Sequence, residues 1–123
     1  MIAKTDLIEK QKLKRFKAKE GAFAVLTSDN KLGQIENISK WGLTFQYAGT
    51  DKPSKGATEI EIFSPAFEFY LKKVPVKAIE ETEIETTVPF SSIPITQLSV
   101  EFGKMTPVQL MLLEHFIENY TYK

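Results

Sequence analysis

Three residues of this chain have types and a spacing that suit ligand chemistry: Asn37, Ser39 and Gly42, in the pattern N-x-S-x-x-G. Asparagine and serine hydrogen-bond their own backbone in tight turns, and glycine occurs where φ is positive or another chain approaches closely. Residues two apart on a strand project from the same face, so Asn37 and Ser39 would present paired donors and acceptors that suit a nucleobase edge. The simpler alternative is an ordinary turn between two strands.

A basic segment, Lys14-Arg15-Phe16-Lys17, lies upstream of this motif. The planar guanidinium of Arg15 can grip phosphate or the O6/N7 edge of guanine with two hydrogen bonds, and it can also stack on a base. Lys14 adds a second positive charge beside it. Arg15 and Lys14 are therefore candidate ligand-binding residues, and the alternative is a solvated basic segment that enters a strand.

Alternating hydrophobic residues predict the elements that must hold these side chains. Gly21–Thr27, Leu32–Ile38 and Leu43–Tyr47 have the composition of strands, and Ser28-Asp29-Asn30-Lys31 has that of a hairpin turn. Three consecutive strands with short links predict an antiparallel meander. The N-x-S-x-x-G motif falls in the connection between the second strand and the third.

The second half of the chain continues with strand patterns at Glu59–Phe63, Phe67–Ile79 and Ile95–Phe102. Pro75 cannot donate a hydrogen bond to a neighbouring strand, so it predicts a bulge or an edge. Glu80–Val88 is acidic and rich in threonine, which predicts a hairpin tip or a surface loop.

The last element is a predicted helix over residues 106–120. Thr106 is a good N-cap, and Pro107 fits the first helical position, whose N–H has no partner. Residues at helical spacing give one apolar face: Leu110, Leu113, Phe116, Ile117 and Tyr120. The pattern as a whole predicts a mainly β fold, an antiparallel six-stranded β-barrel closed by a C-terminal α-helix.

In its motifs and in the order of its elements, the chain resembles the PilZ family, bacterial receptors for cyclic di-GMP. In that family an R-x-x-x-R motif precedes [D/N]-x-S-x-x-G, and both face one ligand. The second motif is complete here, whereas the first retains only Arg15, because Gln11 stands four positions before it. The resemblance implies a PilZ-like split barrel over 15–123, preceded by a flexible or partly helical arm over 1–14.

The resemblance also implies a function: a non-enzymatic cyclic di-GMP receptor that signals to a separate, unidentified output protein. Arg15 would hold phosphate and guanine, Asn37 and Ser39 would contact a guanine edge, and Gly42 would let the backbone come close. Gln11 carries no charge, and losing one charge-assisted contact costs about 1.5–3 kcal/mol. The alternative is a degenerate PilZ-like module that binds a protein partner and no longer binds the nucleotide.

The amino-acid composition argues against several other classes of protein. Sixteen basic and sixteen acidic residues cancel, which argues against binding to a nucleic acid polymer. No cysteine is present, and no apolar run approaches the ~20 residues that span a bilayer, so we expect a cytoplasmic protein without membrane insertion. The sequence shows no nucleophile–base pair, metal cluster or phosphate-cradling glycine loop. We therefore expect no catalytic residue, no metal and no cofactor.

Overall fold

The computed structural model describes residues 15–27, 31–49, 59–84 and 94–122. The predicted arm over 1–14, which contains Lys14 and Gln11, lies outside the described residues. So do positions 28–30 of the predicted hairpin turn and positions 85–88 of the predicted acidic loop.

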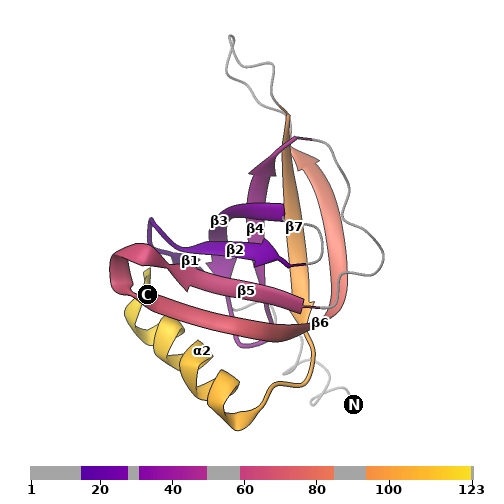
Figure 1. Ribbon diagram of the computed structural model, residues 1–123. Helices are drawn as coiled ribbons and strands as arrows, with labels where there is room; N and C mark the ends of the chain where they lie inside the picture. Colours follow the sequence, from indigo (N-terminus) through magenta and orange to yellow (C-terminus); the bar gives the residue numbers. More distant parts are fainter. Residues whose placement is uncertain (1–14, 28–30, 50–58, 85–93, 123) are drawn as a thin grey trace, which may run out of the picture.

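The described part of the chain forms eight strands, a short 3-10 turn and one α-helix (Figure 1). In chain order these are β1 (Phe16–Ala18), β2 (Phe23–Leu26), β3 (Lys31–Ile38), β4 (Gly42–Ala48), β5 (Glu59–Ser64), η1 (Pro65–Phe67), β6 (Phe69–Ile84), β7 (Ile95–Phe102), α2 (Pro107–Asn119) and β8 (Thr121–Tyr122).

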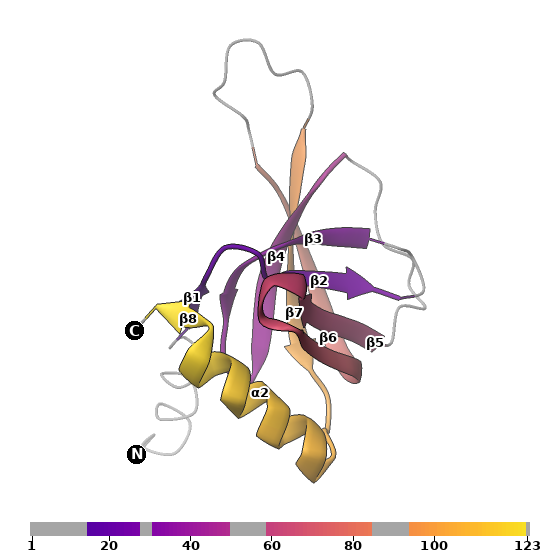
Figure 2. The ribbon, with the colours of Figure 1, turned by 60° about the vertical axis from the view of Figure 1, so that its left-hand side comes forward.

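The strands pair antiparallel in the order β2-β5-β6-β7-β4-β3, and β2 also pairs with β3. That last pairing closes a six-stranded barrel, as the alternation of the sequence predicts. Strands β1 and β8 continue the sheet from β3 outside the ring. Figures 1 and 2 show α2 packed across one end of the barrel, where it contacts β6 and β8.

Side chains alternate between the two faces of the sheet along each strand, so those of one face fill the interior of the barrel. The inward residues of β4 and β7 are buried: Leu43, Phe45, Tyr47, Thr96, Leu98, Val100 and Phe102. The residues between them in sequence, such as Thr44 and Ser99, point to the outer face, because successive strand residues alternate sides. The outer face of β4 and β7 is therefore polar.

The predicted helix begins and ends where expected. The hydroxyl of Thr106 accepts a hydrogen bond from the backbone N–H of Gln109, whose side chain accepts one from the N–H of Thr106 in return. Leu113, Phe116 and Ile117 are buried against the barrel. The prediction was wrong for Leu110, which is 39% exposed.

Strand β6 differs from the prediction at both ends. Phe67 lies in η1, and the strand begins only after Glu68, whose φ of 51° makes the turn. At the other end Glu80–Ile84 was predicted to be loop and is strand, paired residue by residue with Ile95–Ser99. The local composition disfavours a strand, but an ordered partner strand supplies the backbone hydrogen bonds and overrides that preference.

Pro75 is confirmed as the site of an irregularity. Strand β6 pairs with β5 up to Pro75 and with β7 from Val76 onward, and the register shifts on both sides of this point. The carbonyl of Pro75 accepts a hydrogen bond from Gly103 at 2.7 Å. The single strand β6 therefore pairs with both β5 and β7, and it changes partner at Pro75, where the hydrogen-bond ladder is interrupted.

Phe116→Ala should lower the free energy of unfolding by about 3–5 kcal/mol, because a fully buried ring leaves a cavity between α2 and the barrel. Urea denaturation followed by circular dichroism measures the change. Met111→Ala on the same helix is the control, since Met111 is 63% exposed and should change stability by about 0.5 kcal/mol or less. Equal losses in the two variants would contradict the helix orientation.

Candidate functional site

The connection between β3 and β4 is built around the hydroxyl of Ser39. This oxygen accepts hydrogen bonds from the backbone N–H groups of Trp41 at 3.1 Å and Gly42 at 3.3 Å. The N–H of Ser39 donates to the carbonyl of Gly42 at 2.8 Å, which closes the turn. Ser39 is 2% exposed, so its side chain serves the turn. Asn37 lies within β3 and is partly exposed, so the two do not form the exposed polar pair expected from their spacing.

Gly42 is needed for the close approach of a neighbouring strand. A Cβ at this position would lie 2.1 Å from the carbonyl oxygen of Val100 on β7, far inside van der Waals contact. Trp41, next to it, accepts a hydrogen bond at its carbonyl from the N–H of Phe102 at 2.8 Å. The motif glycine thus lets β4 and β7 pair from the first residue of β4.

Arg15 reaches this region because β1 pairs with the end of β3. Lys17 lies opposite Asn37 and Phe16 opposite Ile38, which brings the start of β1 beside the motif. Nη1 of Arg15 donates to Oδ1 of Asn37 at 3.2 Å and to Oγ1 of Thr44 at 3.3 Å. Partial burial lowers the pKa of Arg15 from its ordinary value, but an arginine stays protonated in proteins. The result is a cation whose plane is fixed by two acceptors.

The two acceptors belong to a row of polar residues that crosses four strands. Asn37 on β3 lies opposite Thr44 on β4, Thr44 opposite Ser99 on β7, and Ser99 opposite Glu80 on β6. Directly paired residues share a face of the sheet, so these side chains stand next to one another. The hydroxyls of Thr44 and Ser99 are 3.0 Å apart and hydrogen-bonded. We call Asn37, Thr44, Ser99 and Glu80 the polar row.

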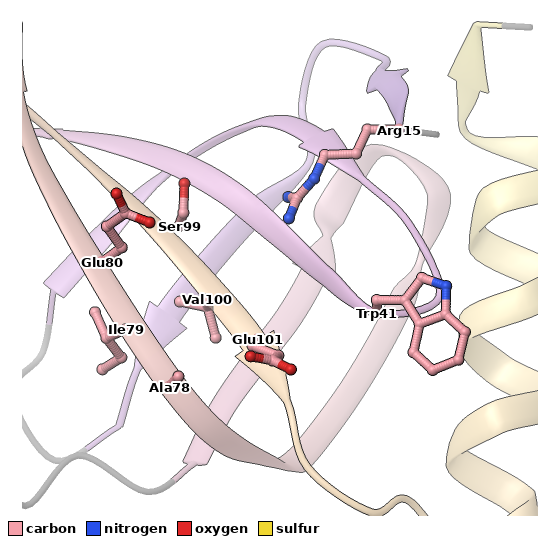
Figure 3. A pocket seen from close by; sticks show the side chains of 8 residues that line it. All are labelled: Arg15, Trp41, Ala78, Ile79, Glu80, Ser99, Val100 and Glu101. Carbon is pink, nitrogen blue, oxygen red and sulfur yellow. The ribbon is translucent and has the colours of Figure 1, made fainter. Parts of the chain in front are cut away.

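A pocket of about 400 Å³ opens beside Arg15 on this outer face (Figure 3). Its walls come from β6, β7, the motif turn and the residue before β1: Arg15, Trp41, Ala78, Ile79, Glu80, Ser99, Val100 and Glu101. Figure 3 shows Arg15 on one side of the pocket and Glu80 on the other, with Ser99 between them. The volume falls in the range of about 300–1,000 Å³ typical of small-molecule sites.

The predicted site residues thus fall into two groups. Arg15 lines the pocket and is hydrogen-bonded to Asn37, whereas Ser39 and Gly42 shape the turn next to it. The predicted contact of the Ser39 hydroxyl with a base stays a prediction, as does any contact from Lys14. Sequence reasoning missed Thr44, Ser99 and Glu80. The sequence did contain a signal for Thr44 and Ser99, because polar residues alternate with the apolar ones along β4 and β7 and must face away from the core.

Other kinds of site find no support in the part of the chain that the structure describes. There, no group of three histidine, cysteine, aspartate or glutamate side chains is placed to hold a metal ion. Within the same ranges, no helix has the length and apolar character to cross a membrane. The single histidine, His115, is exposed on α2 and stacks against Phe69.

Comparison by sequence finds no matching family model and no matching curated protein. Comparison by structure finds the PilZ domain of YcgR from Escherichia coli with cyclic di-GMP, at 17% identity and a TM-score of 0.57, covering 87% of this chain and 88% of that one. It also finds MrkH, described as a transcription regulatory factor dependent on cyclic di-GMP, at 14% identity and a TM-score of 0.55. The chain has the PilZ fold.

The two similarities cover most of this chain but not equal shares of the other proteins. The alignment with MrkH includes 85% of this chain and 48% of MrkH. The barrel with its C-terminal helix is the shared part, and it confirms the predicted PilZ-like architecture.

Ser39→Ala in this PilZ fold should lower the free energy of unfolding by about 1–3 kcal/mol, because two backbone N–H groups would lose their buried acceptor. Chemical denaturation measures the loss. Lys40→Ala, an exposed change in the same turn, is the control and should cost about 0.5 kcal/mol or less. If the two variants were equally stable, the hydroxyl would not be holding the turn.

Proposed function

We propose that this PilZ-fold chain is a non-enzymatic receptor for cyclic di-GMP in the bacterial cytoplasm. The observation that carries the proposal is the fixed guanidinium of Arg15 at the wall of the pocket. Nη1 bonds to Asn37 and Thr44, and the Nε and Nη2 donors remain for a ligand. A guanidinium held this way suits the O6/N7 edge of guanine or a phosphate, both of which accept two parallel hydrogen bonds.

The comparisons support the choice of ligand. The YcgR domain is described with cyclic di-GMP, and MrkH is described as dependent on it. This chain shares their fold and also carries the complete N-x-S-x-x-G motif. The region around Arg15 and the motif turn is therefore the place where we propose that the nucleotide binds.

Each predicted residue has a role in this proposal. Asn37 orients Arg15 through its Oδ1 and keeps its Nδ2 donor for the ligand. Ser39 and Gly42 hold the turn and the strand spacing that place Asn37 and Trp41. Lys14 would add positive charge near the phosphates. Ligand binding would then be communicated to a separate output protein.

The alternative function is a PilZ-like interaction module that no longer binds the nucleotide. Gln11 supports it, because the first motif lacks one of its two arginines. Helix α2 supports it too: Val108 and Met111, three residues apart on the helix surface, are 60% and 63% exposed. The titrations below separate the two functions, since this alternative predicts no heat with cyclic di-GMP.

Arg15→Ala should weaken cyclic di-GMP binding tenfold to about a hundredfold, because it removes charge-assisted hydrogen bonds worth about 1.5–3 kcal/mol. Isothermal titration calorimetry of the purified chain measures the affinity. Lys72→Ala is the matched control, since it removes the same charge from an exposed residue of β6 that does not line the pocket. Equal weakening in both variants, or no binding by the wild type, would contradict the proposal.

Gln11→Arg completes the R-x-x-x-R pattern and should tighten binding by roughly tenfold or more, because it restores a second cationic fork. The same titration measures it, with Gln11→Lys as a variant that adds charge without the planar fork. If neither change alters the affinity of a wild type that binds, position 11 does not contact the ligand.

A further inference from the structure

The polar row has opposite charges at its two ends. Arg15 covers the Asn37–Thr44 end, and Glu80 stands at the far end, beyond Ser99. Thr44 and Glu80 are separated by two strand intervals, about 9–10 Å. Figure 3 shows both charged side chains at the pocket with Ser99 between them.

Glu80 is the carboxylate of this pocket that is left uncompensated. The other one, Glu101, lies 3.7 Å from Nζ of Lys77 and takes part in further interactions. Glu80 has no hydrogen bond or ion pair to any residue in the described part of the chain. Its oxygens are thus available as acceptors for a ligand that enters between β6 and Arg15.

Guanine complements this arrangement and adenine does not. Guanine presents O6 and N7 as acceptors on one edge, and N1–H and the 2-amino group as adjacent donors on the next. Arg15 can donate to the first edge while a carboxylate accepts both hydrogens of the second, a paired geometry that charge strengthens. Adenine would place its 6-amino donor against the guanidinium and the lone pair of N1 against the carboxylate.

The same charges determine which part of a cyclic dinucleotide enters the pocket. A carboxylate at the far wall repels a phosphodiester, so the phosphates stay on the Arg15 side and the base goes in. We propose that Glu80 is the residue that makes this pocket specific for guanine, by accepting hydrogen bonds from N1–H and the 2-amino group. This inference rests on the proposed receptor function and adds the basis of its base selectivity.

The test compares cyclic di-GMP with its adenine counterpart, cyclic di-AMP, on the wild type and on Glu80→Gln. Trp41 is the single tryptophan of the chain and lines the pocket, so its fluorescence reports occupancy beside calorimetry. Glu80→Gln should reduce the preference for guanine over adenine by about tenfold or more, because the glutamine amide keeps one acceptor and loses the charge. Affinity for the adenine ligand should stay equal or rise.

Glu81→Gln is the matched control. It removes the same charge one residue further along β6, where the side chain lies opposite Leu98 rather than Ser99 and does not line the pocket. The proposal requires the guanine preference to be unchanged in this variant. An equal fall of the guanine preference in Glu80→Gln and Glu81→Gln would indicate a general effect of charge and would overturn the proposal.

The remaining outcomes separate this inference from the receptor proposal. If the wild type binds cyclic di-GMP and Glu80→Gln keeps the full guanine preference, the role of Glu80 is overturned and the receptor function stands. If the wild type binds neither nucleotide by either readout, the receptor function fails and the inference fails with it. Urea midpoints of the two variants establish that each is folded in the comparison.

Discussion

The register between β4 and β7 is the constraint on which the rest of the structure depends. Side chains alternate along a strand with a period of two, so a slip of one residue would turn Thr44 and Ser99 into the barrel and Leu43 and Val100 into water. Gly42 secures the register, because only a residue without Cβ can start β4 against the carbonyl of Val100. One backbone contact thereby maintains the apolar core and the polar outer face together.

The outer face could not hold a half-buried cation unless acceptors were already in place. Taking a guanidinium out of water is costly, and hydrogen bonds must replace its hydration. Oδ1 of Asn37 and Oγ1 of Thr44 replace part of it, and Thr44 is in turn bonded to Ser99. Arg15 is therefore held by a chain of bonds that leads back to the paired strands. This explains why a residue outside the regular strands has a defined orientation.

The barrel strands and the helix could be predicted from the sequence, since their patterns are local. Only the family resemblance predicted that Arg15 and Asn37 lie close together. Strand β1 has three residues, which is too short for a detectable periodicity. The Thr44–Ser99 contact depends on which strands are neighbours, and β4 and β7 are not consecutive in the chain. For Ser39 the sequence allowed both a turn and a ligand contact. The structure shows the hydroxyl hydrogen-bonded within the turn, and a contact with a ligand stays a prediction.

The formal charge of zero has a further consequence for binding on this surface. Without a strong overall field, an anionic ligand gains little from electrostatic steering, so affinity must come from contacts made after it arrives. Contacts are most effective when the groups are ordered beforehand, because little conformational entropy is then lost on binding. Arg15, Asn37, Thr44 and Ser99 are ordered in this sense, because hydrogen bonds join their side chains. If the chain binds cyclic di-GMP as proposed, such pre-organisation would offset part of the contact that glutamine at position 11, where the family motif has arginine, cannot make.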